Sequence, residues 1–238
     1  MECALHVLSA EKVTCLTLGD QVLEGIFPGF ESGDFTVLHG AAASFMSFVL
    51  AVRCQMPTGH GGLDSSAIYV DGGNSFNPYT VAEIARSYGL DSRAALERIH
   101  VSRAFTAYQF SALVLEKLGP FLRRKRSKLL VISDISSLFF DKDIPKTEAR
   151  DLFMKVCAKL ADITAEKQAV VVVRYFPEKR SRLGLFFETV LFGRSNVLVR
   201  FKRTGKGVRF VLEGHPRVTL FSMDFPEDYV PLAAFAGV

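Results

Sequence analysis

The sequence predicts an α/β domain, with a mainly parallel twisted sheet flanked by helices and antiparallel strands at its C-terminal end. Up to about residue 173, apolar runs of strand length alternate with longer segments of helical period, as in βα units. Residues 169–173 read AVVVV, which is typical of a strand buried on both faces. Beyond them, Gly205-Lys206-Gly207 separates two strand-like runs, which favours a hairpin.

Each expected element follows from a local pattern. Strands are expected at residues 12–18, 35–38, 67–70, 99–102, 129–132 and 169–173, and C-terminal antiparallel strands at 196–202, 208–213 and 218–222. Helices are expected at residues 44–55, 77–89, 110–118 and 147–164. The second of these begins after Asn77 with Pro78 in its first turn and ends near Gly89, a regular cap and stop.

Size and composition indicate a globular protein. The chain has 238 residues and a hydrophobic fraction of 49%, so we expect a single domain over residues 1–238. It has neither a signal-peptide pattern nor an apolar run of the roughly 20 residues that span a bilayer, so we expect no membrane association and a cytoplasmic, intracellular location. The scattered cysteines predict reduced core thiols rather than a zinc site or disulfides: Cys3, Cys15, Cys54 and Cys157.

Residues 36–47 stand where a phosphate-binding loop would, between a β-branched strand and a helix, and read TVLHGAAASFMS. A P-loop reads G-x-x-x-x-G-K-[ST], because glycines let backbone N–H groups approach phosphate and the lysine reaches its outer oxygens. Gly40 and Ser47 fit this frame, whereas Phe45 and Met46 replace the second glycine and the lysine. The helix start at Ser44 retains the general attraction of helix N-termini for phosphate.

Several segments in order resemble one family. Residues 23–40 read LEGIFPGFESGDFTVLHG, residues 67–78 read AIYVDGGNSFNP, residues 99–104 read IHVSRA and residues 129–132 read LLVI. Together they resemble the core ATPase domain of the RecA/RadA recombinase family, in its archaeal RadA and RadB branch. The resemblance spans about residues 12–225 and implies a RecA-like P-loop NTPase core. It is closest to RadB-like, core-only paralogues that have neither a helical N-terminal DNA-binding domain nor a Phe-x-x-Ala linker.

The resemblance also implies a nucleotide site, and each of its chemical positions is altered. The P-loop lysine is Met46, and the glutamate that activates water is Gly73. The Walker B aspartate falls on Ser133, with Asp134 one place later, where strand alternation would turn it to the other face unless a bulge intervenes. The Asn-Gln pair that senses the γ-phosphate corresponds to Arg174-Tyr175. We therefore expect no catalytic residue, no metal site and a vestigial nucleotide site: Gly40, Ser44, Met46, Ser47, Gly73 and Asp134.

Nucleic acid is the next ligand that the sequence suggests. Basic residues gather at 123–128 and again from residue 174 onwards, which suits a phosphate backbone, although solvated edges of helices and strands explain such clusters equally well. In the resembling family two loops face DNA, here residues 141–146 and 174–187. Cations beside aromatic rings suit single-stranded DNA. The predicted contacts are Arg174, Tyr175, Lys179, Arg180 and Arg182, whereas Phe186, Phe187, Val190 and Leu191 are better explained as one face of a core helix.

The leading hypothesis is a RadA-like paralogue with a degenerate Walker A motif, a pseudo-ATPase that assists DNA recombination and DNA repair by binding single-stranded DNA or a RadA-type recombinase. No cofactor is expected to be required, and ATP with Mg²⁺ bound without turnover stays open. One alternative is a protein-interaction scaffold without nucleic-acid binding, which docks through the apolar segment 225–235. Another is a weak ATPase that uses displaced residues such as Asp134 and Arg174.

Overall fold

The computed structural model describes residues 14–166, 168–177, 181–205, 207–225 and 229. Its strands are β1 (Cys15–Leu16), β2 (Phe30–Glu31), β3 (Phe35–His39), β4 (Ala67–Asp71), β5 (Ile99–Arg103), β6 (Leu129–Ser133), β7 (Val170–Tyr175), β8 (Val197–Thr204), β9 (Gly207–Gly214) and β10 (Phe221–Asp224). Its helices are α1 (Gln21–Glu24), α2 (Ala43–Arg53), α3 (Pro78–Ser87), α4 (Ser92–Glu97), α5 (Ala107–Ala112), α6 (Leu118–Lys125), α7 (Lys146–Ala165) and α8 (Arg182–Phe192). Shorter turns are the 3₁₀ helices η1 (Thr58–His60) and η3 (Ser137–Phe140), and the π-helix η2 (Leu113–Lys117) joins α5 to α6.

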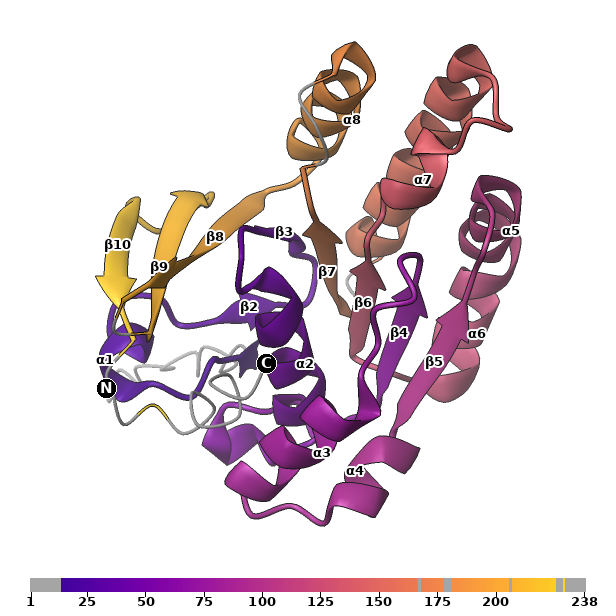
Figure 1. Ribbon diagram of the computed structural model, residues 1–238. Coiled ribbons are helices and arrows are strands. Elements are labelled where there is room, and N and C mark those ends of the chain that lie inside the picture. Colours follow the sequence, from indigo (N-terminus) through magenta and orange to yellow (C-terminus); the bar gives the residue numbers. More distant parts are fainter. Residues whose placement is uncertain (1–13, 167, 178–180, 206, 226–228, 230–238) are drawn as a thin grey trace, which may run out of the picture.

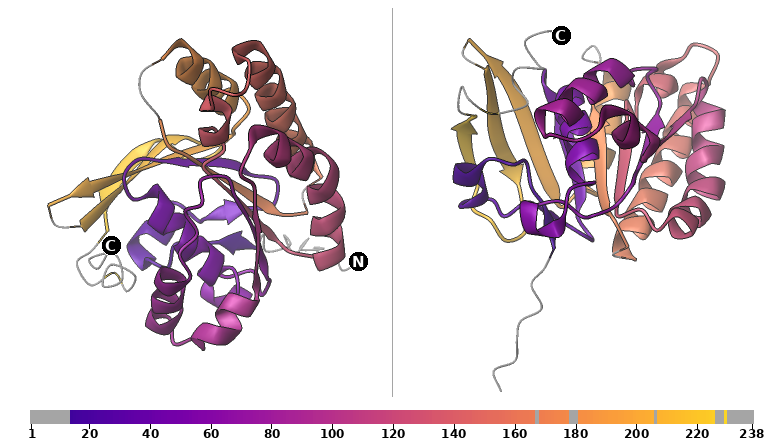
Figure 2. Two further views of the ribbon diagram at one scale, coloured as in Figure 1. Left: turned by 45° about the vertical axis from the view of Figure 1, so that its right-hand side comes forward. Right: turned by 90° about the horizontal axis from the view of Figure 1, so that it is seen from below.

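An eight-stranded sheet runs in the order β10-β9-β8-β3-β7-β6-β4-β5. From β8 to β5 every neighbouring pair is parallel, and β9 and β10 add antiparallel pairs at the other end, which Figure 2 shows as the orange and yellow strands. The predicted α/β class with a mainly parallel sheet is confirmed. The antiparallel part begins one strand later than predicted, because β8 lies parallel to β3 before β9 turns back on it.

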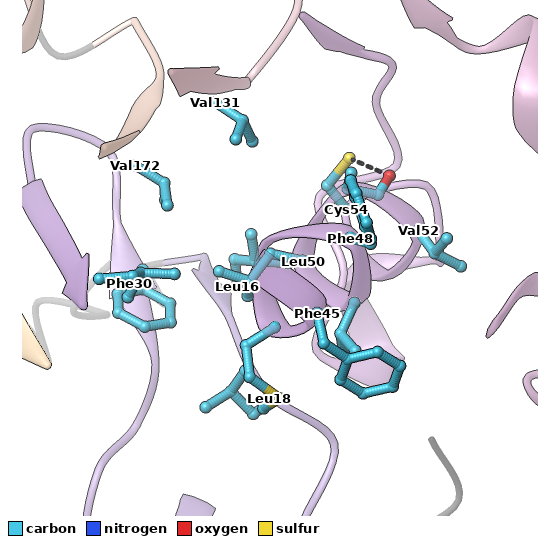
Figure 3. Packing of buried hydrophobic residues seen from close by; sticks show 14 of the residues in the cluster. Leu16, Leu18, Phe30, Phe45, Phe48, Leu50, Val52, Cys54, Val131 and Val172 are labelled. Carbon is cyan, nitrogen blue, oxygen red and sulfur yellow. Dashed lines mark hydrogen bonds between the residues drawn. The ribbon is translucent and has the colours of Figure 1, made fainter. Parts of the chain in front are cut away.

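Helices cover both faces of the sheet (Figure 1). Strand β6 shows the alternation, because Leu129 and Val131 belong to one hydrophobic cluster, whereas Leu130 and Ile132 belong to the other. The first cluster includes residues of α2 and α3, and Figure 3 shows Phe45 and Phe48 of α2 among its members. The second cluster includes α5, α6, α7 and α8. The predicted double burial of the valine strand is confirmed, since the four valines of β7 are fully buried.

The predicted elements are present with shifted ends. Asn77 caps α3 by accepting hydrogen bonds from the Tyr79 and Thr80 amides, as predicted. The helix expected at residues 110–118 spans 107–125 as α5, η2 and α6 together. Strand β1 has two residues, much shorter than expected, and the short helices α1 and α4 were not predicted. Across the described part of the chain, no helix is long and apolar enough to span a membrane.

Candidate nucleotide site and nucleic-acid loops

The loop from β3 to α2 retains the first glycine of the phosphate-loop frame, but α2 already begins at Ala43, three residues before Met46. Gly40 has a φ of +93°, and a side chain there would collide with the carbonyl oxygen of Phe201 on β8, so only glycine fits. The Ala43 amide donates a hydrogen bond to the Gly40 carbonyl at 3.1 Å and closes the turn into α2. No side chain caps the start of α2. The turn at Gly40 is therefore present, whereas residues 43–47 of the frame belong to α2.

Most side chains that follow Gly40 in this frame pack into the protein interior. Met46, at the lysine position, is fully buried in the cluster beneath α2, and Phe45 is 4% exposed (Figure 3). The Ser47 hydroxyl is buried as well and donates a hydrogen bond to the Ser44 carbonyl at 2.6 Å. Residues that would meet phosphate and metal in a working loop thus belong to the protein core or bond to the helix itself.

Asp71, at the end of β4, organises the loop that follows it. Its buried carboxylate accepts hydrogen bonds from the Ser75 and Phe76 amides at 3.0 Å, and Arg103 lies 3.4 Å away. Asp71 is thus a hydrogen-bond acceptor at the end of its strand. The loop carries Gly73 to the protein surface, at the position of the family's glutamate.

Arg174 of β7 lies inside the site. Its side chain is 9% exposed, and its guanidinium donates hydrogen bonds to the hydroxyls of Ser133 and Ser75 at 3.1 and 3.0 Å. It also forms an ion pair with Asp134. Burial lowers the pKa of the Arg174 guanidinium, an effect that Tyr69 and Asp71 partly oppose. Three side chains of the same chain, those of Ser75, Ser133 and Asp134, therefore bind this cation.

Asp134 reaches Arg174 because the backbone turns sharply after β6. Asp134 has a φ of +52°, a left-handed conformation that aspartate tolerates better than most residues. The expected one-residue slip is thereby cancelled, and the side chains of Ser133 and Asp134 both meet the same guanidinium. A Cβ atom on Gly73 would lie 2.7 Å from the Asp134 Cβ, so a side chain at position 73 would require Asp134 to move. The glutamate position and Asp134 therefore compete for one space.

The site has few groups that suit Mg²⁺. No cluster of three or more His, Cys, Asp or Glu side chains occurs among the residues that the structure describes. Ser47 and Ser133 flank the Tyr69 hydroxyl, whose pKa is raised by burial, and Ser133 shares a 2.8 Å hydrogen bond with Ser75. Magnesium binding relies on carboxylates and phosphate oxygens, and neutral hydroxyls are poor substitutes. These residues do not fit ATP with Mg²⁺.

Two of the predicted nucleic-acid contacts lie elsewhere than expected. Strand β7 ends at Tyr175 instead of residue 173, and Leu38 and His39 of β3 pair with Arg174 and Tyr175. Both side chains are consequently buried, and the prediction that they lie in an exposed loop is wrong. The Tyr175 hydroxyl donates to Glu188 at 3.5 Å, and its ring meets Phe192 edge-on.

In the rest of the second loop, the structure describes residues 176–177 and those from Ser181 onwards. Phe176 is 54% exposed directly after β7, and Arg182 is exposed at the start of α8, which Ser181 caps. Lys179 and Arg180 fall outside the described residues. The amphipathic interpretation of α8 is confirmed, since Phe187 and Leu191 are fully buried while Phe186 and Val190 pack beside them. In the first loop, residues 141–143 are exposed and Ile144 is buried.

Sequence reasoning missed the role of Ser75. Its hydroxyl connects Arg174 to Ser133, and its amide binds Asp71. The available signal was its place four residues after the end of β4, at the same sheet edge as the ends of β6 and β7. Parallel neighbouring strands bring their carboxyl ends together, so polar residues just after them are expected to meet.

The fold and site define a RecA-like α/β domain in which Met46 and Gly73 stand where the resembling family has lysine and glutamate. A family model described as Rad51 matches residues 9–174, and the chain belongs to this family of RecA/RadA recombinases. The DNA repair protein RAD51 of Saccharomyces cerevisiae is 29% identical over 221 residues, covering 85% of this chain and 54% of that protein. DNA repair protein RAD51 homolog 1 of Arabidopsis thaliana is 31% identical over 152 residues, covering 60% and 43%. The chain thus spans about half the length of these curated relatives.

Proposed function

We propose that this chain is a Rad51-family paralogue that does not hydrolyse ATP and that assists homologous recombination and DNA repair. Its family membership and relatives that are called DNA repair proteins support the process. One observation carries the loss of hydrolysis: the guanidinium of Arg174, which is nearly buried inside the site, is paired with Asp134.

Phosphoryl transfer depends on positioning and charge stabilisation, so its requirements can be checked residue by residue. The P-loop cation is replaced by a buried Met46, and the position of the general base is Gly73. A water molecule near Gly73 has no carboxylate at that position to accept its proton. Ser133 offers a hydroxyl where a metal-bound aspartate would stand.

Single-stranded DNA is the proposed ligand of the second loop. Exposed Phe176 supplies a ring for base stacking, and Arg182, with Lys179 and Arg180 of the same loop, supplies charge for phosphates. Arg174 and Tyr175 are no longer part of this proposal, because both are buried. The proposed partner on DNA is a RadA-type recombinase, in keeping with an accessory role.

ATP turnover measured with and without single-stranded DNA tests the proposal. We expect the wild-type rate to equal that of Ser47→Ala, since the hydroxyl is already bonded within α2. A clear rate of ATP hydrolysis that Ser47→Ala abolishes would contradict the proposal.

Binding of single-stranded DNA at low salt tests the second loop. The affinity should weaken when Lys179, Arg180 and Arg182 become alanine. Arg93→Ala, which removes an exposed arginine of α4, is the control and should leave the affinity unchanged.

A second candidate function, a protein-interaction scaffold, is favoured by a different observation. Strand β5 ends the sheet order, and an apolar cavity of about 500 Å³ lies between β4, β5 and the η2–α6 helix, lined by Ile68, Val70, Leu113, Leu118 and Phe121 among others. The C-terminal segment 225–235 does not supply this docking surface in the described residues, because Phe225 and Tyr229 are buried and its other residues lie outside them. Recombinase binding that survives nuclease treatment and is lost in Leu113→Ala with Phe121→Ala would favour this function.

A further inference from the structure

The surroundings of Arg174 have the composition of a receptor for a small anion. A nearly buried guanidinium offers several N–H donors, and the hydroxyls of Ser75 and Ser133 stand at hydrogen-bond distance from it. Guanidinium groups bind carboxylates and phosphates strongly because the planar N–H donors match paired oxygens. In this chain the anion is Asp134, whose own side chain is 15% exposed.

Three features of the surrounding residues favour the contact between Asp134 and Arg174. Asp134 adopts a left-handed φ of +52°, which costs a non-glycine residue energy and directs the side chain back toward β7. Gly73 has no side chain, and any Cβ there would meet the Cγ of Asp134 at 2.5 Å. Ser133 and Ser75 bond to each other as well as to Arg174, which fixes both hydroxyls.

We propose that Arg174, held in place by the hydroxyls of Ser133 and Ser75, forms an oxyanion-binding site whose resident ligand is the chain's own Asp134 carboxylate. The ligand class is a small carboxylate or a tetrahedral oxyanion such as phosphate. The inference rests on the proposed function, because it takes the site to be closed to ATP by this internal ligand. It also connects the altered positions, since Gly73, Asp134 and Arg174 are one mutually dependent set.

Removal of the internal ligand tests the proposal directly. Asp134→Gly removes a group of the size of acetate, and glycine adopts the left-handed backbone easily. The unpaired Arg174 should lower the melting temperature by on the order of 10 °C. Added acetate or inorganic phosphate should then raise it by about 4 °C at tenfold excess over its Kd, compared with sodium chloride at equal ionic strength.

The matched controls separate a site from a general salt effect. Asp224→Ala removes one half of the exposed Arg209–Asp224 pair and should show no selective response to acetate. Arg174→Met combined with Asp134→Gly lacks the cation and should not respond either. An absent acetate response in Asp134→Gly, or an equal response in the Arg174→Met double variant, would overturn the proposal.

A second variant covers the case in which Asp134→Gly alone does not fold. Gly73→Glu combined with Asp134→Gly returns a carboxylate from the neighbouring loop, and we expect it to recover a cooperative thermal transition. A double variant no more stable than Asp134→Gly contradicts the proposal. ATP hydrolysis by the wild type would instead contradict the proposed function while leaving the anion rescue unaffected, so the two failures are distinguishable.

Discussion

The two sides of the predicted nucleotide site hold different kinds of side chains. On the β3–α2 side, the space of the lysine side chain is taken by apolar packing, with Met46 fully buried. On the side where β6 and β7 end, an ion pair between Asp134 and Arg174 fills the space. One half of the site is now hydrophobic core, and the other half is a buried polar network.

The difference has energetic consequences. Burial of an apolar side chain such as Met46 stabilises the fold by roughly 1.5–3 kcal/mol and depends on no partner charge. A buried ion pair gains little overall, because desolvation offsets attraction, but removal of one member leaves an uncompensated charge. Single substitutions of Asp134 or Arg174 should therefore lower the free energy of unfolding most. On the β3–α2 side, replacing Met46 by the family lysine should not restore ATP hydrolysis.

The largest effect is expected for Arg174→Ala, which leaves Asp134 without its cation. Loss of one member of a buried pair costs about 3–5 kcal/mol of unfolding free energy, measurable by urea denaturation. Arg209→Ala breaks an exposed pair with Asp224 and is the matched control, with a much smaller effect. Equal losses in both variants would show that the strand-end network is not a buried one.

Met46→Lys restores the family lysine on the other side. Because the position is fully buried, an ammonium group there must be desolvated or must distort α2, and we expect a loss of about 3 kcal/mol. Met46→Leu, which conserves volume, should cost less than about 1.5 kcal/mol. We expect no ATP turnover from Met46→Lys. A Met46→Lys variant that is as stable as the wild type and hydrolyses ATP would contradict the difference that we describe between the two sides.

Gly73→Glu restores the family glutamate and should cost about 1–3 kcal/mol, because its Cβ overlaps Asp134. A Cβ atom on Gly59 would meet no other atom within 4 Å, so Gly59→Glu is the control and should be close to neutral. Melting temperatures of the two variants compare them directly. A Gly73→Glu variant as stable as the control would mean that Asp134 moves away freely.

The smallest effect concerns pH and a partly buried histidine that lies outside both sides. His215 Nδ1 accepts hydrogen bonds from the Arg217 and Val218 amides, and burial lowers its pKa, with Arg217 acting in the same direction and Asp34 and Glu31 opposing it. The pKa of His215 in the folded state lies below the unfolded value of about 6.5. The contribution of the neutral ring to the free energy of unfolding is therefore fully present above about pH 6.5, and it is lost as the pH falls from there toward the folded pKa. His215→Gln should flatten the change in urea midpoint between pH 7.5 and 5.5. If the urea midpoint of His215→Gln changes with pH as much as that of the wild type, other groups cause the pH dependence.

The sheet could be predicted because its strands carry strong local patterns. Runs such as the valines of β7 and the apolar residues of β6 identify themselves without knowledge of neighbours. The ends were less predictable. Arg174 and Tyr175 extend β7 only because β3 pairs with them, a contact that no local pattern records.

The residues that differ from the resembling family were visible in sequence, but the ion pair between Asp134 and Arg174 was not. Met46 and Gly73 stand out against the resembling family, whereas the Asp134–Arg174 pair joins residues forty positions apart. Its formation depends on the left-handed turn at Asp134, and neither the turn nor the pairing has a sequence signature. Strand order supplies the missing information, because it places the ends of β6 and β7 side by side.

The most direct test of a nucleotide site closed by its own residues is a crystal structure of the chain grown with an ATP analogue and Mg²⁺. The account predicts the Arg174–Asp134 pair intact, Met46 still buried and no nucleotide bound along the loop from Gly40 to Ser47. A nucleotide phosphate bound in that loop, with Arg174 turned from Asp134 toward it, would contradict the account.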